Sequence, residues 1–135
     1  MASYKHTVQY YETDKMGITH HSNYIRFMEE ARIYFLNSIG QGYDKLEKEG
    51  VISPVVSVSC NYKMPTTFPD EIEITVKLTS ISPVKFSLSY LMTVKDKTVC
   101  TAESTHCFVS AAGKPISIAK NYPELYEILC NLKES

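Results

Sequence analysis

The sequence lacks three features: a large net charge, a long apolar run and a CxxC pair of cysteines. Its 14 Lys and Arg residues are balanced by 15 Asp and Glu residues, which leaves a formal net charge of -1. A nearly neutral chain has no overall field to hold nucleic acid or an anionic membrane. The most apolar stretches, such as Val51–Val58, are too short and too interrupted to span a bilayer. We therefore expect no nucleic-acid partner and no integral membrane segment.

The N-terminal residues and the cysteines bear on the cellular compartment. Met1–His6 contains no apolar run of secretory length, and we expect a soluble, cytoplasmic protein. No two cysteines form a CxxC pair, and their spacing matches no common zinc-binding template. We expect free thiols rather than a disulfide framework, and no metal site built on the cysteines.

What is present is an ordinary globular composition. The chain has 135 residues, of which 44% are hydrophobic and 21% are charged. That length suits one domain with a substantial core, and we find no internal repeat, low-complexity tract or linker. We therefore expect a single domain over residues 1–135.

The first half of the chain predicts a strand and one long helix. Lys5–Glu12 is strand-like, with Val8 and Tyr10 on one face. Apolar residues then recur at the helical spacing i, i+3, i+4, i+7, which predicts a helix over Asn23–Ile39. We expect the Ser22 hydroxyl to cap its start and Gly40 to end it. The helix's charged residues mostly fall off the apolar stripe: Arg26, Glu29, Glu30 and Arg32.

After Pro54 the apolar residues alternate with polar ones, which predicts strands. Three runs, over residues 56–64, 71–78 and 84–94, should each bury one face. Thr98–Ser110 alternates less cleanly and is predicted to be buried on both faces. Tyr122–Asn131 is predicted to be a short helix. One wide-striped helix and five strands predict an α+β fold, with a five-stranded antiparallel sheet wrapped around one long central helix.

The segment just before the long helix carries the chemistry. It contains two carboxylates, Glu12 and Asp14, then Gly17 and the adjacent pair His20 and His21. The first N–H groups of a helix lack intrahelical partners and carry partial positive charge, so they can stabilise an oxyanion. A nearby carboxylate can act as general base or nucleophile. These are the two parts that hydrolysis of an acyl compound needs, whereas adjacent histidines point apart and make a poor metal site.

Position alone does not assign catalysis, because an Asp before a turn commonly serves the turn itself. The segment, however, resembles the signature of the 4-hydroxybenzoyl-CoA thioesterase family in the hotdog superfamily, and within it the branch of acyl-CoA thioesterases associated with Tol–Pal gene clusters. The matching residues are Tyr11-Glu12-Thr13-Asp14, Gly17, His21-Ser22-Asn23-Tyr24, Glu29-Glu30-Ala31-Arg32 and Pro54-Val55-Val56. Glu12 replaces the first Asp of the family pattern, and His20 stands where an aromatic residue is common.

The resemblance implies a hotdog fold and an acyl-CoA thioesterase for small or medium acyl groups. It implies that Asp14 is the catalytic carboxylate and that the His21 backbone N–H is the oxyanion donor, with the His21 side chain assisting. Gly17 would allow close approach of the substrate. Lys63 and Lys85, on polar strand faces, are candidates to bind the coenzyme A phosphates. The resemblance implies no metal or organic cofactor.

The resemblance also implies a homodimer at least, and we expect a homotetramer, because a single unit leaves sheet edges open. Three alternatives remain open at this point. The thioester could be carried by acyl carrier protein rather than coenzyme A. A His21/Glu29 pair shared between subunits could support dehydration or hydration. The chain could also be a non-catalytic module that binds acyl thioesters. The identity of the acyl chain is open in each case.

Overall fold

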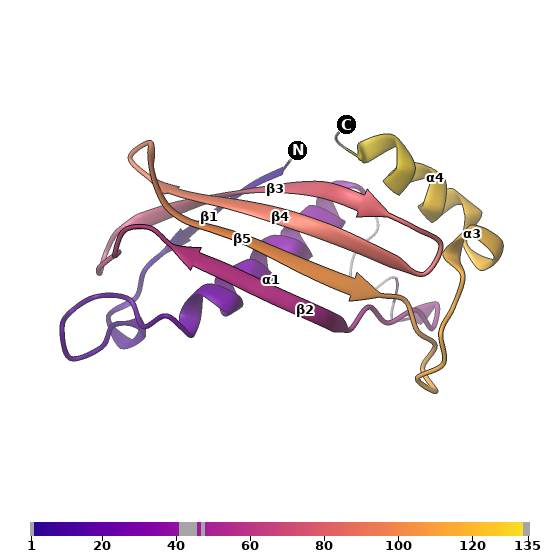
Figure 1. The fold of residues 1–135 in the computed structure, drawn as a ribbon, viewed down its shortest axis with the longest axis horizontal. Coiled ribbons are helices and arrows are strands. Elements are labelled where there is room, and N and C mark those ends of the chain that lie inside the picture. Colours follow the sequence, from indigo (N-terminus) through magenta and orange to yellow (C-terminus); the bar gives the residue numbers. More distant parts are fainter. Residues whose placement is uncertain (1, 41–45, 47, 134–135) are drawn as a thin grey trace.

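The computed structural model describes residues 2–40, 46 and 48–133. One five-stranded sheet, with strand order β1-β3-β4-β5-β2 and every pairing antiparallel, lies across one long helix (Figure 1). The strands are β1 (Ala2–Thr7), β2 (Val55–Tyr62), β3 (Glu71–Ile81), β4 (Lys85–Val94) and β5 (Lys97–Cys107). The helices are α1 (Asn23–Ser38), α3 (Ile118–Asn121) and α4 (Pro123–Leu132), and Tyr10–Glu12 forms one 3-10 turn. The predicted α+β architecture is confirmed.

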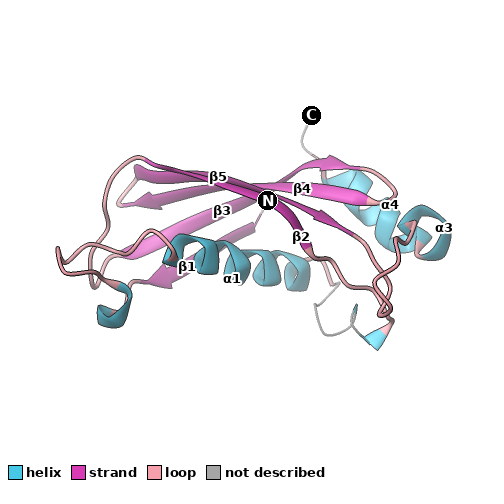
Figure 2. Cartoon of the chain, turned by 60° about the horizontal axis from the view of Figure 1, so that its bottom comes forward, coloured by secondary structure: helices cyan, strands magenta, loops and turns pink. Residues whose placement is uncertain are grey.

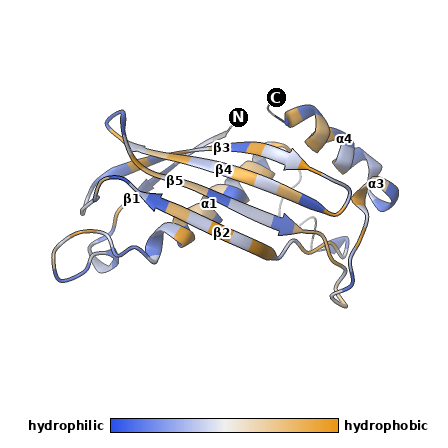
Figure 3. Cartoon of the chain, viewed as in Figure 1, coloured by the Kyte–Doolittle hydropathy of each residue, from blue (hydrophilic) through white to orange (hydrophobic). Residues whose placement is uncertain are grey.

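The core lies between α1 and one face of the sheet. Figure 2 shows α1 running beneath the sheet, while α3 and α4 sit at one end of it. The apolar stripe of α1 is buried, as its spacing predicts: Tyr24, Phe27, Met28, Ala31, Phe35 and Leu36. The strands bury every second residue against this stripe, as in Ile72, Ile74, Val76 and Leu78 of β3. Figure 3 shows the resulting alternation of hydropathy along β3 and β4.

Both ends of the long helix agree closely with the sequence. The predicted helix over Asn23–Ile39 ends one residue earlier, at Ser38. Gly40 follows with a φ of +77°, a left-handed conformation that favours glycine and stops a helix. The predicted C-terminal helix is present as α4, which buries Leu125 and Leu129 at the end of the sheet. Within the described residues, no helix is long and apolar enough to cross a membrane.

The predicted strand over Lys5–Glu12 is wrong at both ends. Strand β1 begins at Ala2 and stops at Thr7, after which the chain turns into the 3-10 turn. The turn forms because the Gln9 N–H donates to the Glu12 carboxylate at 2.7 Å. Val8 is therefore buried, whereas Tyr10 lies on the surface rather than on the same face.

Two of the later strands also differ from the prediction. Strand β5 buries one face, not two, and its alternation is obscured because the polar residues Ser104 and His106 point into the core. A register shift between Met92 and Thr93 also interrupts its pairing with β4. Strand β2 lies at the sheet edge and leaves most of its residues exposed, so the buried face predicted for it is largely absent.

One charged residue of α1 is buried against expectation. Arg32 is only 3% exposed, and its guanidinium donates to the carbonyl and hydroxyl oxygens of Ser53, 3.2 and 3.0 Å away. It also bonds the Glu29 carboxylate. Hydrogen bonds and a carboxylate offset the cost of burying the charge.

The buried His106 predicts a specific dependence of stability on pH. Its Nε2 lies 2.7 Å from Ser104 Oγ, and its ring stacks on Phe86. Burial, with a contribution from the Arg32 charge, lowers the pKa of His106 from 6.5 to about 4. Between these two pKa values, the folded state therefore binds fewer protons than the unfolded chain. The contribution of neutral His106 to the free energy of unfolding is complete above the unfolded pKa and is lost as pH falls towards the folded pKa.

We expect the free energy of unfolding to fall by about 2 kcal/mol through His106 between about pH 7 and about pH 5. Denaturant unfolding of His106→Gln should show a pH dependence smaller by about that amount. His20→Gln, at an exposed ring, is the matched control and should keep the wild-type dependence. Equal pH dependence in wild type and His106→Gln would contradict the assignment.

Candidate active site

The loop that carries Asp14 is a tight turn closed on itself. The Asp14 N–H donates to the Ile18 carbonyl at 2.8 Å, and the Gly17 N–H donates to the Asp14 carbonyl at 3.0 Å. Asp14 Oδ1 accepts the Met16 N–H at 2.8 Å, which orients the carboxylate. No described residue donates a hydrogen bond to Oδ2. One carboxylate oxygen is thus fixed by the loop and the other has no protein donor among the described residues.

Gly17 has a defined role in this turn. Its φ of +79° is left-handed, which a residue with a side chain rarely adopts. A Cβ added there would meet no atom within 4 Å, so the turn, not crowding, requires the glycine. Its carbonyl accepts the Thr67 hydroxyl at 2.7 Å, which ties the turn to the segment before β3. Gly17 is not among the residues that line the cavity described below, and its role in substrate binding stays a prediction.

Glu12 anchors the loop to the body of the protein. Its carboxylate is buried and lies 2.9 Å from His6 Nε2, while the other His6 nitrogen lies 3.3 Å from a Glu30 carboxylate oxygen. The Glu12 carbonyl accepts both the His20 N–H and the Asn23 side-chain amide, each at 2.9 Å. One residue therefore joins β1, the loop and the start of α1.

The start of α1 differs from the predicted cap. Ser22 is the N-cap residue, but its side chain makes no capping hydrogen bond. Its hydroxyl lies 2.9 Å from His20 Nδ1 instead. The first turns are closed by the backbone, since the Asn23 and Tyr24 N–H groups donate to the His20 and His21 carbonyls. No described residue accepts a hydrogen bond from the His21 N–H.

Asp14 and His21 line the same cavity, and Lys63 lines it too. The cavity has a volume of about 490 Å³ and is open to solvent beside the end of β2. Its remaining lining is mainly apolar: Met16, Ile18, Thr19, Tyr24, Tyr62, Met64 and Pro65. Three of the five predicted site residues are therefore brought together, at the start of α1.

Hydroxyl groups fix the wall of this cavity. The Tyr24 hydroxyl lies 2.9 Å from Thr66 Oγ1, which lies 2.6 Å from Thr19 Oγ1. Burial raises the pKa of Tyr24, so its hydroxyl stays protonated near neutral pH. The Tyr62 hydroxyl donates to the His21 carbonyl at 3.2 Å. The sequence pattern placed Tyr62 on a strand but gave no signal that it would reach the helix start.

Lys85 does not line the cavity of Asp14 and His21. It begins β4 and pairs with Cys107, whereas Tyr62, next to the cavity, pairs with Cys100 at the opposite end of β5. Within one copy of the chain, Lys85 is therefore far from Asp14, and its predicted contact with substrate stays untested. Among the described residues, no group of three or more His, Cys, Asp or Glu side chains could hold a metal ion.

The sequence and the fold match known proteins. Residues 8–128 match the family model of the thioesterase-like superfamily. A protein of Aquifex aeolicus (strain VF5), "Putative esterase", is 40% identical over 126 residues, covering 93% of this chain and 95% of that protein. "Putative acyl-CoA thioesterase YneP" of Bacillus subtilis (strain 168) is 32% identical over 119 residues, covering 87% of this chain and 86% of that protein.

A solved structure has the same fold as this chain. The DHNA-CoA thioesterase from Staphylococcus aureus superposes with a TM-score of 0.93 at 26% identity, covering 96% of this chain and 89% of that one. The hotdog fold expected from the sequence is confirmed. The predicted enzyme class is confirmed as well: the chain is a thioester hydrolase. By its sequence match over residues 8–128 and by its fold, the chain belongs to the thioesterase-like superfamily.

Proposed function

We propose that the chain is an acyl-CoA thioesterase, one catalytic domain that hydrolyses a small or medium acyl-CoA to the free acid and coenzyme A. The observation that carries this is the shared cavity of Asp14 and His21, in which the His21 N–H has no acceptor among the described residues. A carboxylate and an unpaired N–H at a helix start are the two groups that thioester hydrolysis requires. The resemblance of Tyr11–Tyr24 to the 4-hydroxybenzoyl-CoA thioesterase signature supports the same branch of the superfamily.

The proposed reaction uses these two groups in sequence. The thioester carbonyl oxygen accepts a hydrogen bond from the His21 N–H. Asp14 either takes a proton from an attacking water or attacks the carbonyl carbon itself, and both routes place negative charge on that oxygen. The carbon–sulfur bond then breaks and coenzyme A leaves as a thiolate, which in the first route takes up the proton held by Asp14 and so restores the carboxylate. In the second route, water cleaves the resulting anhydride and restores the Asp14 carboxylate.

The lining of the cavity supports the substrate class. Its apolar residues, including Ile18, Tyr24 and Met64, suit an acyl group of modest size within about 490 Å³. Lys63 is exposed on the rim, where its ammonium group can pair with a phosphate of coenzyme A. Relatives named as acyl-CoA and DHNA-CoA thioesterases support coenzyme A over acyl carrier protein.

The edge strand supports assembly into a dimer. Among the described residues, strand β2 pairs only with β5, and its valines are unusually exposed: Val55 by 51%, Val56 by 50% and Val58 by 40%. An exposed edge with apolar side chains invites pairing with another strand. We propose that two copies pair their β2 strands antiparallel about a two-fold axis. This pairing would bring the Val55 end of one copy to the Tyr62 end of the other, and Lys85 of the partner subunit towards the cavity.

The first prediction from the proposed function concerns the Asp14 carboxylate. Asp14→Asn should lower turnover of acyl-CoA about a thousandfold or more, because it removes the base or nucleophile. That removal costs several kcal/mol of transition-state stabilisation. Free-thiol release from a panel of acyl-CoAs measures this, with circular dichroism to confirm folding. Glu127→Gln, which removes an exposed carboxylate on α4, is the control and should keep full activity. Activity retained by folded Asp14→Asn would refute the proposed role.

The second prediction concerns the lysines. Lys63→Ala should raise KM for acyl-CoA about twofold to fivefold and leave kcat unchanged, because an exposed charge pair contributes up to about 1 kcal/mol to binding. Lys85→Ala should raise KM to a similar extent if Lys85 of the partner subunit reaches the substrate. Lys114→Ala, at an exposed turn, is the control for charge. A fall in kcat at unchanged KM would contradict a role in binding coenzyme A.

The third prediction concerns the β2 edge. Val56→Lys should halve the mass of the assembly in light scattering, because charge on an edge strand disfavours pairing. The control is Val84→Lys, at another exposed valine, in the turn between β3 and β4. An unchanged mass for Val56→Lys, or a wild-type mass of 15.3 kDa, would rule out the β2 dimer.

A further inference from the structure

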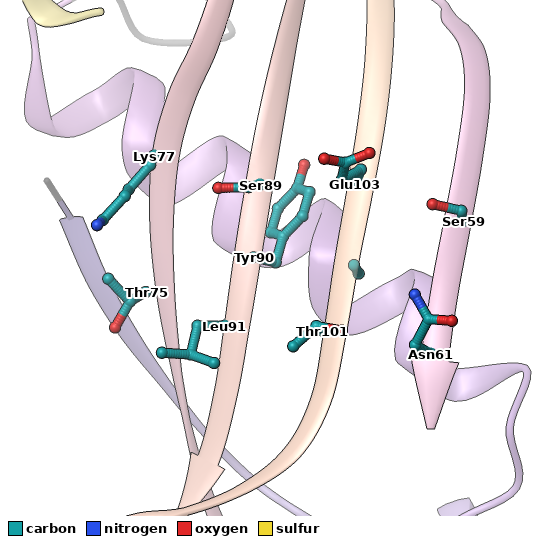
Figure 4. A pocket seen from close by; sticks show the side chains of 10 residues that line it. Ser59, Asn61, Thr75, Lys77, Ser89, Tyr90, Leu91, Thr101 and Glu103 are labelled. Atoms are coloured by element: carbon teal, nitrogen blue, oxygen red, sulfur yellow. The ribbon is translucent and has the colours of Figure 1, made fainter. Parts of the chain in front are cut away.

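The sheet carries two groups of polar side chains, one on each face. On the outer face, Thr75, Ser89 and Thr101 line a depression on three adjacent strands (Figure 4). The second group lies on the opposite face, against α1, where the side chain of His6 on β1 is only 12% exposed. Water can satisfy the polar groups of the outer face, whereas a ring enclosed by protein needs partners from the protein itself. The partners of His6 lead to the loop that carries Asp14.

The first partner of His6 is the buried carboxylate of Glu12. His6 Nε2 lies 2.9 Å from Glu12 Oε1, which also accepts the Gln9 N–H at 2.7 Å. An ionised carboxylate can only accept hydrogen bonds, so this contact requires a proton on His6 Nε2. The Glu12 side chain is 7% exposed. The two donors therefore offset the cost of burying its charge.

Helix α1 holds the His6 ring in place. The ring packs on Phe27, with the two ring centroids 4.2 Å apart. The other ring nitrogen, Nδ1, lies 3.3 Å from Glu30 Oε1, which accepts the Tyr4 hydroxyl at 2.6 Å. The ring thus lies between two carboxylates, one at each nitrogen. Strand β1 and helix α1 together direct Nε2 at Glu12.

Glu12 transmits this constraint to both groups of the candidate site. Asp14 follows Glu12 by two residues in the chain. The Glu12 backbone carbonyl accepts the His20 N–H and the Asn23 side-chain amide, each at 2.9 Å, from residues on either side of His21. A shift of Glu12 therefore displaces the Asp14 carboxylate relative to the His21 N–H. Displacement of reacting groups by about 1 Å can lower a rate about a hundredfold.

We propose that His6 is a positioning residue for thioester hydrolysis, an inference that rests on the proposed roles of Asp14 and His21. His6 does not line the cavity of Asp14. It acts through its hydrogen bond to Glu12, which fixes the turn that carries Asp14 and the backbone beside the His21 N–H. The contact also gives a physical reason for glutamate at this position of the resembled signature. An aspartate is one methylene shorter and would leave His6 Nε2 without this acceptor.

Two amide variants separate the contact with Glu12 from the contact with Glu30. His6→Gln places its amide nitrogen where Nε2 lies and keeps the donor to Glu12, whereas His6→Asn places it where Nδ1 lies and loses that donor. His6→Asn should lower kcat for acyl-CoA about tenfold to a hundredfold and keep KM within about twofold, because substrate still binds but the reacting groups are displaced. His6→Gln should keep most of the wild-type kcat. Lys5→Asn, at an exposed position of the same strand, is the matched control and should keep the wild-type kcat.

A double-mutant cycle tests whether His6 acts through Glu12. Glu12→Asp draws the carboxylate away from His6 and should lower kcat to a similar extent as His6→Asn. The double variant should lose little more than either single variant, because both changes remove the same contact. Denaturant unfolding of each variant sets the temperature of the assay, at which all of them must be fully folded.

The outcomes separate this proposal from the catalytic one. A lower kcat in folded His6→Asn, its recovery in His6→Gln and a non-additive cycle support the proposal. Wild-type kcat in both amide variants overturns it, and so does an equal loss in both, because the packing of the ring would then be what matters. If His6→Asn fails to fold, a wild-type kcat in Glu12→Asp overturns the proposal. Activity retained by Asp14→Asn counts against the catalytic proposal instead, whereas inactive Asp14→Asn with fully active His6→Asn counts only against the role of His6.

Discussion

The packing of α1 against one face of one sheet is the constraint on which the rest of the structure depends. A single helix can cover only one face, and the described α3 and α4 lie at the end of the sheet. Strands β3 and β4 therefore bury alternate residues and leave the others outward. The same packing brings the start of α1 beside the edge strand β2, where Tyr62 reaches the His21 carbonyl. The position of the site and the composition of the outer face both follow from this one contact.

The loop that carries Asp14 depends in turn on Glu12, one of the residues at which the sequence departs from the resembled signature. A buried carboxylate is costly unless it is paired and hydrogen-bonded. Here the Glu12 carboxylate lies within hydrogen-bond distance of His6 and accepts the Gln9 N–H. The Glu12 backbone carbonyl accepts the His20 N–H and the Asn23 side-chain amide. With the His20 N–H bound to Glu12, the next N–H along the chain, that of His21, is left without an acceptor among the described residues. The buried network thus fixes the backbone of the residue that directly precedes the candidate oxyanion donor.

The sequence predicted those features whose signals are local. The apolar stripe and Gly40 set α1 to within one residue, and the spacing of Asp14 and His21 before the helix predicted two groups that line one cavity. The sequence did not predict features that depend on contacts between residues far apart in the chain. Arg32 is buried because it meets Ser53, which is 21 residues away in the sequence. The buried polar residue His106 interrupts the apolar alternation by which β5 would be recognised. Only the strand register shows that Lys85 and Tyr62 lie at opposite ends of the sheet.

In the proposed β2 dimer, assembly and chemistry are connected through the edge of the sheet. Donors aimed at a developing oxyanion stabilise it most in a site that excludes water. In one copy, Asp14 and His21 line a cavity that opens beside Tyr62, itself on the exposed edge strand. A second copy paired at β2 would cover this opening and so strengthen the electrostatic interaction with the substrate.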